Sequence, residues 1–205
     1  GELLQSDFFK EIPLDLFGIN KNTLINIISE APKQITAFIN TLIEISQNYN
    51  LGKERFYFAV LRSFQELHDN YFPEIEKTAQ DFAFENNLKL GKNIDIEHLE
   101  KILTENFGYE IKSENFENHG TLNNLRSLYI PEKNLLLLNQ LLDENQKTFI
   151  FAKEIGFNVL KLNPRPNTYS WLDFTSFDEL LNNYYASYFA GCILIPKEEL
   201  VEKLE

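Results

Sequence analysis

Apolar residues recur at spacings of three and four through the first half of the chain, which is typical of amphipathic helices. One helix is predicted over Ala31–Asn48. A second, more regular stripe consists of Tyr57, Val60, Leu61, Phe64, Leu67, His68 and Tyr71. Pro73 is expected to end or kink that second helix, because proline lacks a backbone donor and clashes with the preceding turn. Helical spacing resumes after Pro73, so residues 1–90 are predicted to be a helical segment.

The pattern changes after Asn86–Asn93, a polar stretch that contains Gly91 and is the predicted boundary between a first domain, 1–90, and a second, 91–205. Ile94–Asn106 has helical spacing. Three later runs have the composition of strands, namely Phe107–Phe116, Leu125–Ile130 and Leu135–Leu138. The second domain is therefore expected to contain a small sheet of about three strands.

Two long helices are predicted after the strands. The first, Glu144–Leu160, follows Asp143 and is apolar on nearly all sides, which places it at the centre of a core. The second, Phe177–Ala190, is preceded by Ser176, and Glu179 completes the spacing of a capping box. Small residues four apart on this helix, which would let another helix approach closely, are Ala186 with Ala190 and Ser187 with Gly191. The predicted fold class is α+β, mostly helical.

Charge and cysteine content narrow the function classes. The formal net charge is −12, and the arginines are Arg55, Arg62, Arg126 and Arg165. Because proteins bind nucleic acid by neutralising phosphates with Lys and Arg, this chain taken alone is a poor candidate for binding DNA. Cys192 is the single cysteine, which excludes an intramolecular disulfide and a cysteine-rich metal site. No apolar stretch is long enough to span a bilayer, so no membrane partner is expected and a cytoplasmic location is the default.

Chemistry is suggested by the stretch Phe149-Ile150-Phe151-Ala152-Lys153-Glu154-Ile155-Gly156-Phe157. It resembles the catalytic helix of the ImmA/IrrE family of metallopeptidases, which carries an HExxH motif within a phrase like F-x-x-A-H-E-L-G-H. In that family two histidines four apart bind zinc, and the glutamate between them acts as general base on the bound water. The third ligand is a glutamate in a later phrase like E-A-N-x-F-A, which Tyr185–Ala190 resembles here.

All three zinc-ligand positions of that family hold other residues in this chain. They are Lys153 and Phe157 in the first long helix and Tyr185 in the second. An ammonium group repels a metal ion, phenylalanine cannot bind one, and tyrosine is a rare zinc ligand. Only Glu154 of the catalytic motif remains. The resemblance, which covers Ile94–Leu204, implies a degenerate zinc-peptidase-like domain that has no metal, no cofactor and no enzymatic activity.

Two further segments resemble the short-chain fatty-acyl regulator branch of the XRE family of helix-turn-helix transcription factors. They are Leu61–Pro73 and Asn182–Gly191. This resemblance implies a sensing region whose effector is an acyl-CoA or similar metabolite, and which reaches DNA only through an N-terminal domain absent from this chain. Some relatives carry an iron–sulfur cluster on several cysteines, which a chain with Cys192 alone does not support.

Arg62, His68 and Tyr71 form a first group of candidate ligand contacts. The hypothesis is that they face the sensing pocket and contact the phosphate or thioester of an acyl-CoA, since the guanidinium fork suits phosphate. The alternatives are structural. Arg62 has the spacing to pair with Glu66 at i, i+4, and a histidine on an apolar stripe is often a hydrogen-bonded core residue.

The remaining candidate contacts surround the former zinc position and are Lys153, Glu154, Phe157, Tyr184 and Tyr185. Lys153 could meet an anionic ligand, or it could pair with Glu154 or another carboxylate, because an unpaired buried charge is costly. The structural alternative for Glu154 is an ion pair with Lys153, with Lys161 or with a residue elsewhere. The tyrosines could be core residues, although Tyr185 occupies a lost ligand position and could line the old cleft.

The sequence therefore predicts the ligand-sensing and dimerising region of a cytoplasmic transcription regulator. The expected partners are a small-molecule effector and a second copy of the chain. Two other interpretations stay open at this point, namely a metallopeptidase with an atypical site and a pure protein-interaction or dimerisation module.

Overall fold

The computed structural model describes residues 13–20, 22, 23, 26, 37, 53–91, 94–116, 125–166 and 174–195. The chain divides into two compact units, Gly1–Tyr71 and Phe72–Glu205. This division lies one helix before the sequence-based boundary near residue 90, which stays a prediction. The helix predicted over Ala31–Asn48 lies, apart from one residue, outside the described part of the chain.

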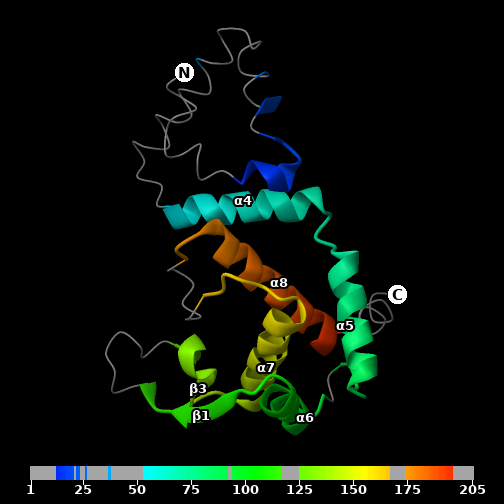
Figure 1. Cartoon of the computed structure of the whole chain (residues 1–205), viewed down its shortest axis with the longest axis vertical. Helices are drawn as coiled ribbons and strands as arrows, with labels where there is room; N and C mark the ends of the chain where they lie inside the picture. The colour runs from blue at the N-terminus through cyan, green and yellow to red at the C-terminus, as the bar shows by residue number, and fades with distance from the viewer. Residues whose placement is uncertain are drawn as a thin grey trace. The chain divides into compact units, whose positions relative to one another are not determined.

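In its described part the first unit contains the short 3-10 helix η2 (Leu14–Phe17) and the helix α4 (Lys53–Leu67), both drawn in Figure 1. The apolar stripe predicted for α4 is buried at Tyr57, Val60, Leu61 and Phe64. These positions repeat at intervals of three and four, which confirms the helical period read from the sequence.

The helix before Pro73 ends earlier than the sequence predicted. α4 stops at Leu67, and Asp69 and Asn70 then take left-handed backbone conformations with φ of 53° and 54°. Short polar side chains tolerate this conformation, which cannot continue a right-handed helix. Pro73 is instead the first residue of the next helix, where its missing N–H needs no partner. As a result His68 is exposed, and its interpretation as a core histidine is wrong.

The described part of the second unit combines helices with one small sheet. Its helices are α5 (Pro73–Glu85), α6 (Ile96–Lys101), α7 (Glu144–Val159) and α8 (Phe177–Leu194), and its strands are β1 (Glu110–Glu114), β2 (Ser127–Ile130) and β3 (Leu135–Asn139). The strand order is β1-β3-β2, with β1 parallel and β2 antiparallel to β3. The predicted α+β, mostly helical fold with a sheet of about three strands is confirmed.

Side chains at the helix starts explain where α7 and α8 begin. Asp143 and Gln146 form a complete capping box at the start of α7. The box predicted at the start of α8 is only half formed. The Ser176 hydroxyl accepts from the Glu179 N–H at 3.2 Å, but the Glu179 carboxylate accepts from the N–H and hydroxyl of Thr175 at 2.9 and 2.8 Å. Thr175 offers two donors where the N-cap backbone offers one, which accounts for the difference.

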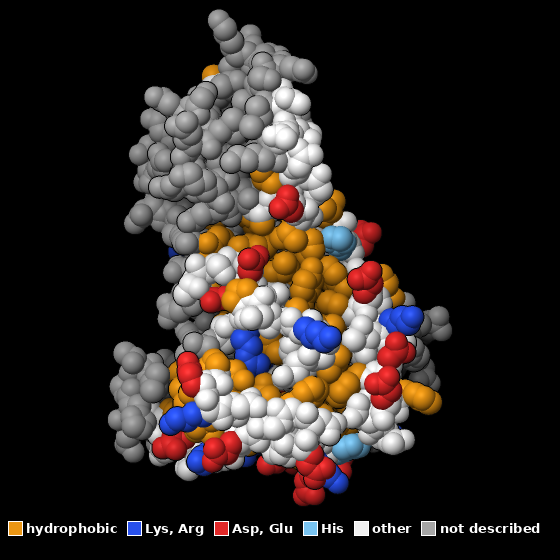
Figure 2. All heavy atoms as spheres, viewed as in Figure 1, with side chains coloured by type: hydrophobic (Ala, Val, Ile, Leu, Met, Phe, Trp, Pro, Cys, Tyr) orange, Lys and Arg blue, Asp and Glu red, His pale blue; other side chains and the backbone are white. Residues whose placement is uncertain are grey.

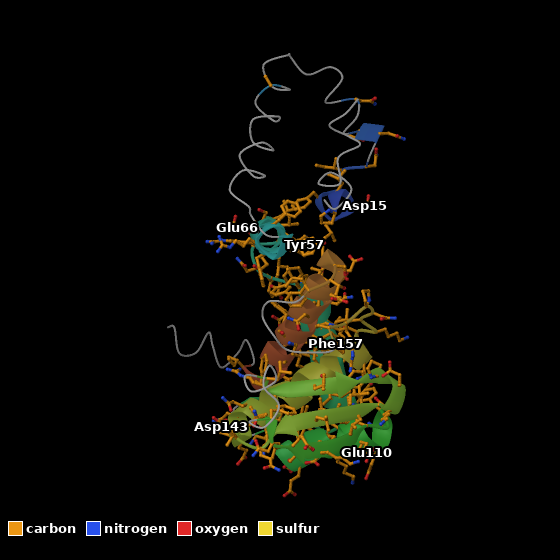
Figure 3. All side chains as sticks on the ribbon, turned by 90° about the vertical axis from the view of Figure 1, so that its left-hand side faces the viewer. Asp15, Tyr57, Glu66, Glu110, Asp143 and Phe157 are labelled. Atoms are coloured by element: carbon orange, nitrogen blue, oxygen red, sulfur yellow. The ribbon has the colours of Figure 1, made fainter. Side chains whose placement is uncertain are left out.

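Helix α7 lies at the centre of the second unit, as its apolar sequence predicted. Every residue from Ile150 to Phe157 is buried, and α7 packs against α6 and α8 (Figure 1). Asp143 and Phe157 mark the two ends of α7 in Figure 3. This central position means that polar side chains on α7 must find partners inside the protein.

Gly156 sets the distance between α7 and α8. A Cβ atom at this position would lie 3.0 Å from Phe189 Cδ1 and 3.1 Å from the backbone oxygen of Ala186. Ala186 and Ala190 are fully buried, so one of the two predicted small-residue stripes lies where the helices approach closely. Among the described helices, none is both long enough and apolar enough to cross a bilayer.

Candidate functional site

Two neighbouring charged residues of α7, Lys153 and Glu154, form the centre of the candidate site. Glu154 is completely buried and Lys153 is 5% exposed. Successive residues of a helix point about 100° apart, so the two side chains face different surroundings. The site therefore has two sides with different partners.

On the Glu154 side, the carboxylate is held by Tyr109 and Arg165. The Tyr109 hydroxyl donates to Glu154 Oε2 at 2.9 Å, and Arg165 Nη1 lies 3.1 Å from the same oxygen. The Tyr109 oxygen in turn accepts from Arg165 Nη1 at 3.0 Å and from Asn158 Nδ2 at 2.9 Å. Burial, and then the charge of Glu154, raise the pKa of Tyr109 far above its usual range, so its hydroxyl stays a donor.

Arg165 also connects this network to the position of the second lost zinc ligand. Its guanidinium carbon lies 3.3 Å from the centre of the Tyr129 ring and 5.1 Å from the centre of the Phe157 ring. A cation over an aromatic face is attracted by the ring quadrupole, and the attraction grows as water is excluded. Phe157 therefore contacts the cation that neutralises Glu154.

On the other side, the Lys153 ammonium donates to the side-chain oxygen of Asn183 on α8 at 2.7 Å. Burial lowers the pKa of Lys153 to about 7, and the nearby charge of Glu154 opposes this only in part. The expected Lys153–Glu154 pair thus acts through the electrostatic field. Lys153 donates a hydrogen bond to Asn183, whereas Glu154 accepts one from Tyr109 and forms an ion pair with Arg165.

Lys153 borders a pocket of about 380 Å³, called here the Lys153 pocket. Its lining residues are Arg126, Asp143, Asn145, Gln146, Phe149, Ile150, Lys153, Phe174, Asn183 and Ser187. Phe149, Ile150 and Phe174 supply an apolar wall, and Asn183 and Ser187 supply polar groups from α8. An apolar wall with a few polar groups is the usual composition of a small-molecule site.

Tyr185, at the third lost ligand position, is surrounded by other aromatic residues. Its ring centre lies 5.6 Å from that of Phe72 and 6.0 Å from that of Tyr184. Burial, followed by the influence of Tyr184 and Glu74, raises the pKa of Tyr185. The nearby Tyr188 accepts from the Phe72 N–H at 3.2 Å and donates to Glu76 at 2.9 Å. Tyr184 and Tyr185 thus belong to an aromatic cluster at the start of α5, and neither lines the Lys153 pocket.

The residues at the three positions where the resembled family has its zinc ligands do not fit a zinc ion. Lys153 is hydrogen-bonded to an amide, Phe157 packs against a guanidinium group, and Tyr185 packs in the aromatic cluster. Within the described part of the chain, no group of three or more His, Cys, Asp or Glu side chains could hold a metal ion. The metal chemistry of the resembled family therefore has no support from the donors at this site.

The other three candidate contacts, Arg62, His68 and Tyr71, belong to the first unit. Arg62 forms an exposed ion pair with Glu66 at 3.3 Å, which is the structural alternative weighed from the sequence. His68 stacks edge-on against Phe64, with ring centres 4.5 Å apart. Tyr71 is 42% exposed. Their contact with an effector stays a prediction.

The sequence analysis missed Tyr109, Arg165 and Asn183 as site residues. Arg165 had a signal in the sequence, because a buried glutamate needs a cation and arginine is the one best suited to pair with a carboxylate. Asn183 had none, since an asparagine on a helix is commonly a surface residue.

Basic side chains are dispersed on one face of the described part of the chain (Figure 2). On the face seen in Figure 2, the Lys and Arg side chains of the described residues are scattered among acidic and hydrophobic ones and do not form one patch. A phosphate backbone is bound by basic groups that act together.

Comparisons with known proteins bear on the second unit most directly. Residues 104–205 match the family model of the IrrE N-terminal-like domain. Among solved structures, the chain is similar to a Mycobacterium tuberculosis transcriptional regulator, with 17% sequence identity and a TM-score of 0.54. The likeness covers 72% of this chain and 43% of that chain, so this chain spans less than half the length of the regulator. At this identity the likeness shows the fold alone. No curated protein matches the chain.

Proposed function

Because residues 104–205 match the family model of the IrrE N-terminal-like domain, we propose that this chain is the ligand-sensing region of a transcription regulator, in which a former peptidase site recognises a metabolite and no longer hydrolyses peptides. The family and the fold of a transcriptional regulator support a regulatory role.

The observation that carries the proposal is that Lys153 and Glu154, although adjacent in the sequence, have different surroundings. Glu154, at the position of the family's general base, accepts a hydrogen bond from Tyr109, forms an ion pair with Arg165 and is fully buried. A general base must be able to reach a water molecule that a metal ion has acidified. Lys153, at the position of the first zinc ligand, instead borders a pocket. The same two positions thus support recognition and disfavour hydrolysis.

An acyl-CoA or similar small metabolite is the proposed effector. The Lys153 pocket has room for a short acyl group against Phe149, Ile150 and Phe174, and Arg126 with Lys153 supplies positive charge. Its volume is near the lower end of the range for ligand pockets, so the nucleotide part of such a ligand would extend outside it. A ligand with different affinities for two states would shift their populations and thereby regulate a DNA-binding domain elsewhere in the regulator. A homodimer is the assembly we propose for transmitting that shift.

The test is thermal stability measured against a panel of acyl-CoA thioesters. We expect a rise in Tm with at least one thioester, because a ligand that binds only the folded state stabilises it. Phe149→Ala removes part of the pocket wall and should reduce the rise. Phe84→Ala, at a side chain on α5 that is 87% exposed, is the matched control and should leave it unchanged.

If no thioester raises the Tm at millimolar concentration, the result counts against ligand sensing. It would favour the alternative of a protein-interaction or dimerisation module. The alternative of an atypical metallopeptidase finds no support in the side chains at positions 153, 157 and 185.

A further inference from the structure

Lys153 has the surroundings of a reactive amine. Its side chain is buried on α7, yet it lines a pocket together with Phe149 and Ile150 of the same helix and Asn183 of α8. A lysine ammonium is strongly hydrated in water, so placing it beside aromatic and aliphatic side chains favours the uncharged amine. A desolvated lysine in an apolar pocket is one of the known ways in which proteins make a nucleophile at neutral pH.

The charged groups around Lys153 leave this effect in place. Glu154 is held by Arg165 on the other side of α7, and its field opposes the effect of burial only in part. The other charged residues of the pocket, Arg126 and Asp143, have opposite signs. From α8, the group that faces the amine is the neutral amide of Asn183.

The fraction of Lys153 that is uncharged follows from these surroundings. With a pKa lowered to about 7, Lys153 is uncharged in a sizeable fraction of the molecules at neutral pH. A solvated lysine with a pKa of about 10.4 is uncharged in only roughly one molecule in 2,500 at the same pH. Lys153 is therefore expected to react at neutral pH where exposed lysines do not.

We propose that the Lys153 pocket binds a small aldehyde covalently, as an imine with the Lys153 amine. The lone pair of Nζ attacks the carbonyl carbon, and transfer of a nitrogen-bound hydrogen to the carbonyl oxygen gives a carbinolamine. The hydroxyl and the second amine hydrogen then leave as water, and the C=N double bond forms. One water is released for each imine, and no oxidant or reductant is consumed. The inference rests on the proposed ligand-binding role of the pocket and adds aldehydes, as a second chemical class of ligand, to the thioesters proposed above.

The shape of the pocket favours a compact aldehyde with an apolar side. Phe149, Ile150 and Phe174 would contact the apolar part, while Asn183 orients the amine through its hydrogen bond. The volume of about 380 Å³ limits the ligand to a small molecule.

The experiment uses benzaldehyde as the probe and sodium cyanoborohydride to reduce any imine to a stable amine, followed by digestion and mass spectrometry. At pH 7, we expect the benzyl adduct on Lys153 in large excess over Lys161, an exposed lysine at the end of the same helix. Labelling of Lys153 should be half-maximal near pH 7, whereas labelling of exposed lysines should rise only at much higher pH. Lys153→Met should lose the main adduct, and Lys161→Arg should keep it.

Labelling spread over exposed lysines, with Lys153 unmodified, would overturn the covalent proposal. Benzyl alcohol, which has the same ring and no carbonyl group, distinguishes ligand binding in the pocket from imine formation. If it raises the Tm of the wild type more than that of Phe149→Ala while no Lys153 adduct forms, the pocket binds ligands and the covalent step is wrong. If neither compound binds nor reacts, the aldehyde proposal fails, and the thioester panel alone decides whether this pocket binds a ligand.

Discussion

Replacing Arg165 by methionine tests the electrostatic account of the site most directly. The side chains of Glu154 and Arg165 are 0% and 13% exposed, so water screens their ion pair poorly. Removing one member of a buried pair costs about 3–5 kcal/mol, because the remaining charge stays in a medium of low polarity. Tyr109 still donates to the same carboxylate oxygen, which retains part of the stabilisation. We therefore expect Arg165→Met to lower the free energy of unfolding by about 3 kcal/mol.

Urea unfolding at neutral pH, followed by circular dichroism, measures this loss. A change of this size lowers the urea midpoint by roughly 1–3 M for a domain of ordinary m-value. Lys112→Met is the matched control, because Lys112 pairs with Glu110 in the same unit but both side chains are more than half exposed. Exposed pairs contribute little, and the control should change stability by no more than about 0.5 kcal/mol.

A second substitution distinguishes two causes of the lost stability, namely the buried charge of Glu154 and the lost packing of Arg165 on Tyr129. Glu154→Gln removes the uncompensated charge, so in the Arg165→Met background it should restore part of the lost stability. The reasoning is refuted if Arg165→Met costs no more than Lys112→Met. It is also refuted if Glu154→Gln adds a further loss to Arg165→Met, since the two changes would then act independently.

Three further predictions concern the same helix and its surroundings. Gly156→Ala should destabilise the protein by about 1–3 kcal/mol in urea unfolding, because its Cβ would press on Phe189, whereas Gly191→Ala meets no atom within 4 Å and should be neutral or stabilising by up to about 1 kcal/mol. The folded pKa of Lys153, about 7, lies below its unfolded value of about 10.4, so the unfolded chain holds more protons between these limits and stability rises with pH there. The wild type should accordingly gain stability relative to Lys153→Met between pH 7 and pH 9, and parallel curves for the two proteins would contradict this. Elemental analysis of the purified protein should find no stoichiometric zinc; an ion present in the wild type and lost from the Lys153→Ala, Glu154→Gln double variant would revive a metallopeptidase.

The elements of the fold that were predictable depend on short-range patterns. The apolar surface of α7 and the small residues of α8 are visible in the sequence. Both helices begin where they were expected, although α8 continues to Leu194, four residues beyond its predicted end. The early end of α4 had a local signal in Asp69-Asn70 that the long apolar stripe obscured. The half-formed cap of α8 depends on Thr175, one residue outside the motif. These errors come from competition between local signals of similar strength.

The partners of the site residues could not be predicted in the same way, because they come from distant parts of the chain. Tyr109 is 45 residues from Glu154, and Arg165 is 56 residues from Tyr109. No periodic pattern links such positions, and only the packed fold brings them together. The arginine that pairs with Glu154 could still have been narrowed to two candidates, because Arg126 and Arg165 are the only arginines beyond residue 90.

The retained glutamate explains why the two sides of the site differ. A glutamate buried at the centre of a core requires a positive charge nearby, and in a zinc peptidase the metal ion contributes to that charge. Lys153 stands next to Glu154 in the sequence, but its ammonium donates to Asn183 on another side of the helix. Arg165, brought in by the loop after α7, supplies the direct ion pair instead. Because Arg165 neutralises Glu154, Lys153 can face the pocket without being needed to hold the core together, and Lys153→Met should therefore be tolerated where Arg165→Met is not.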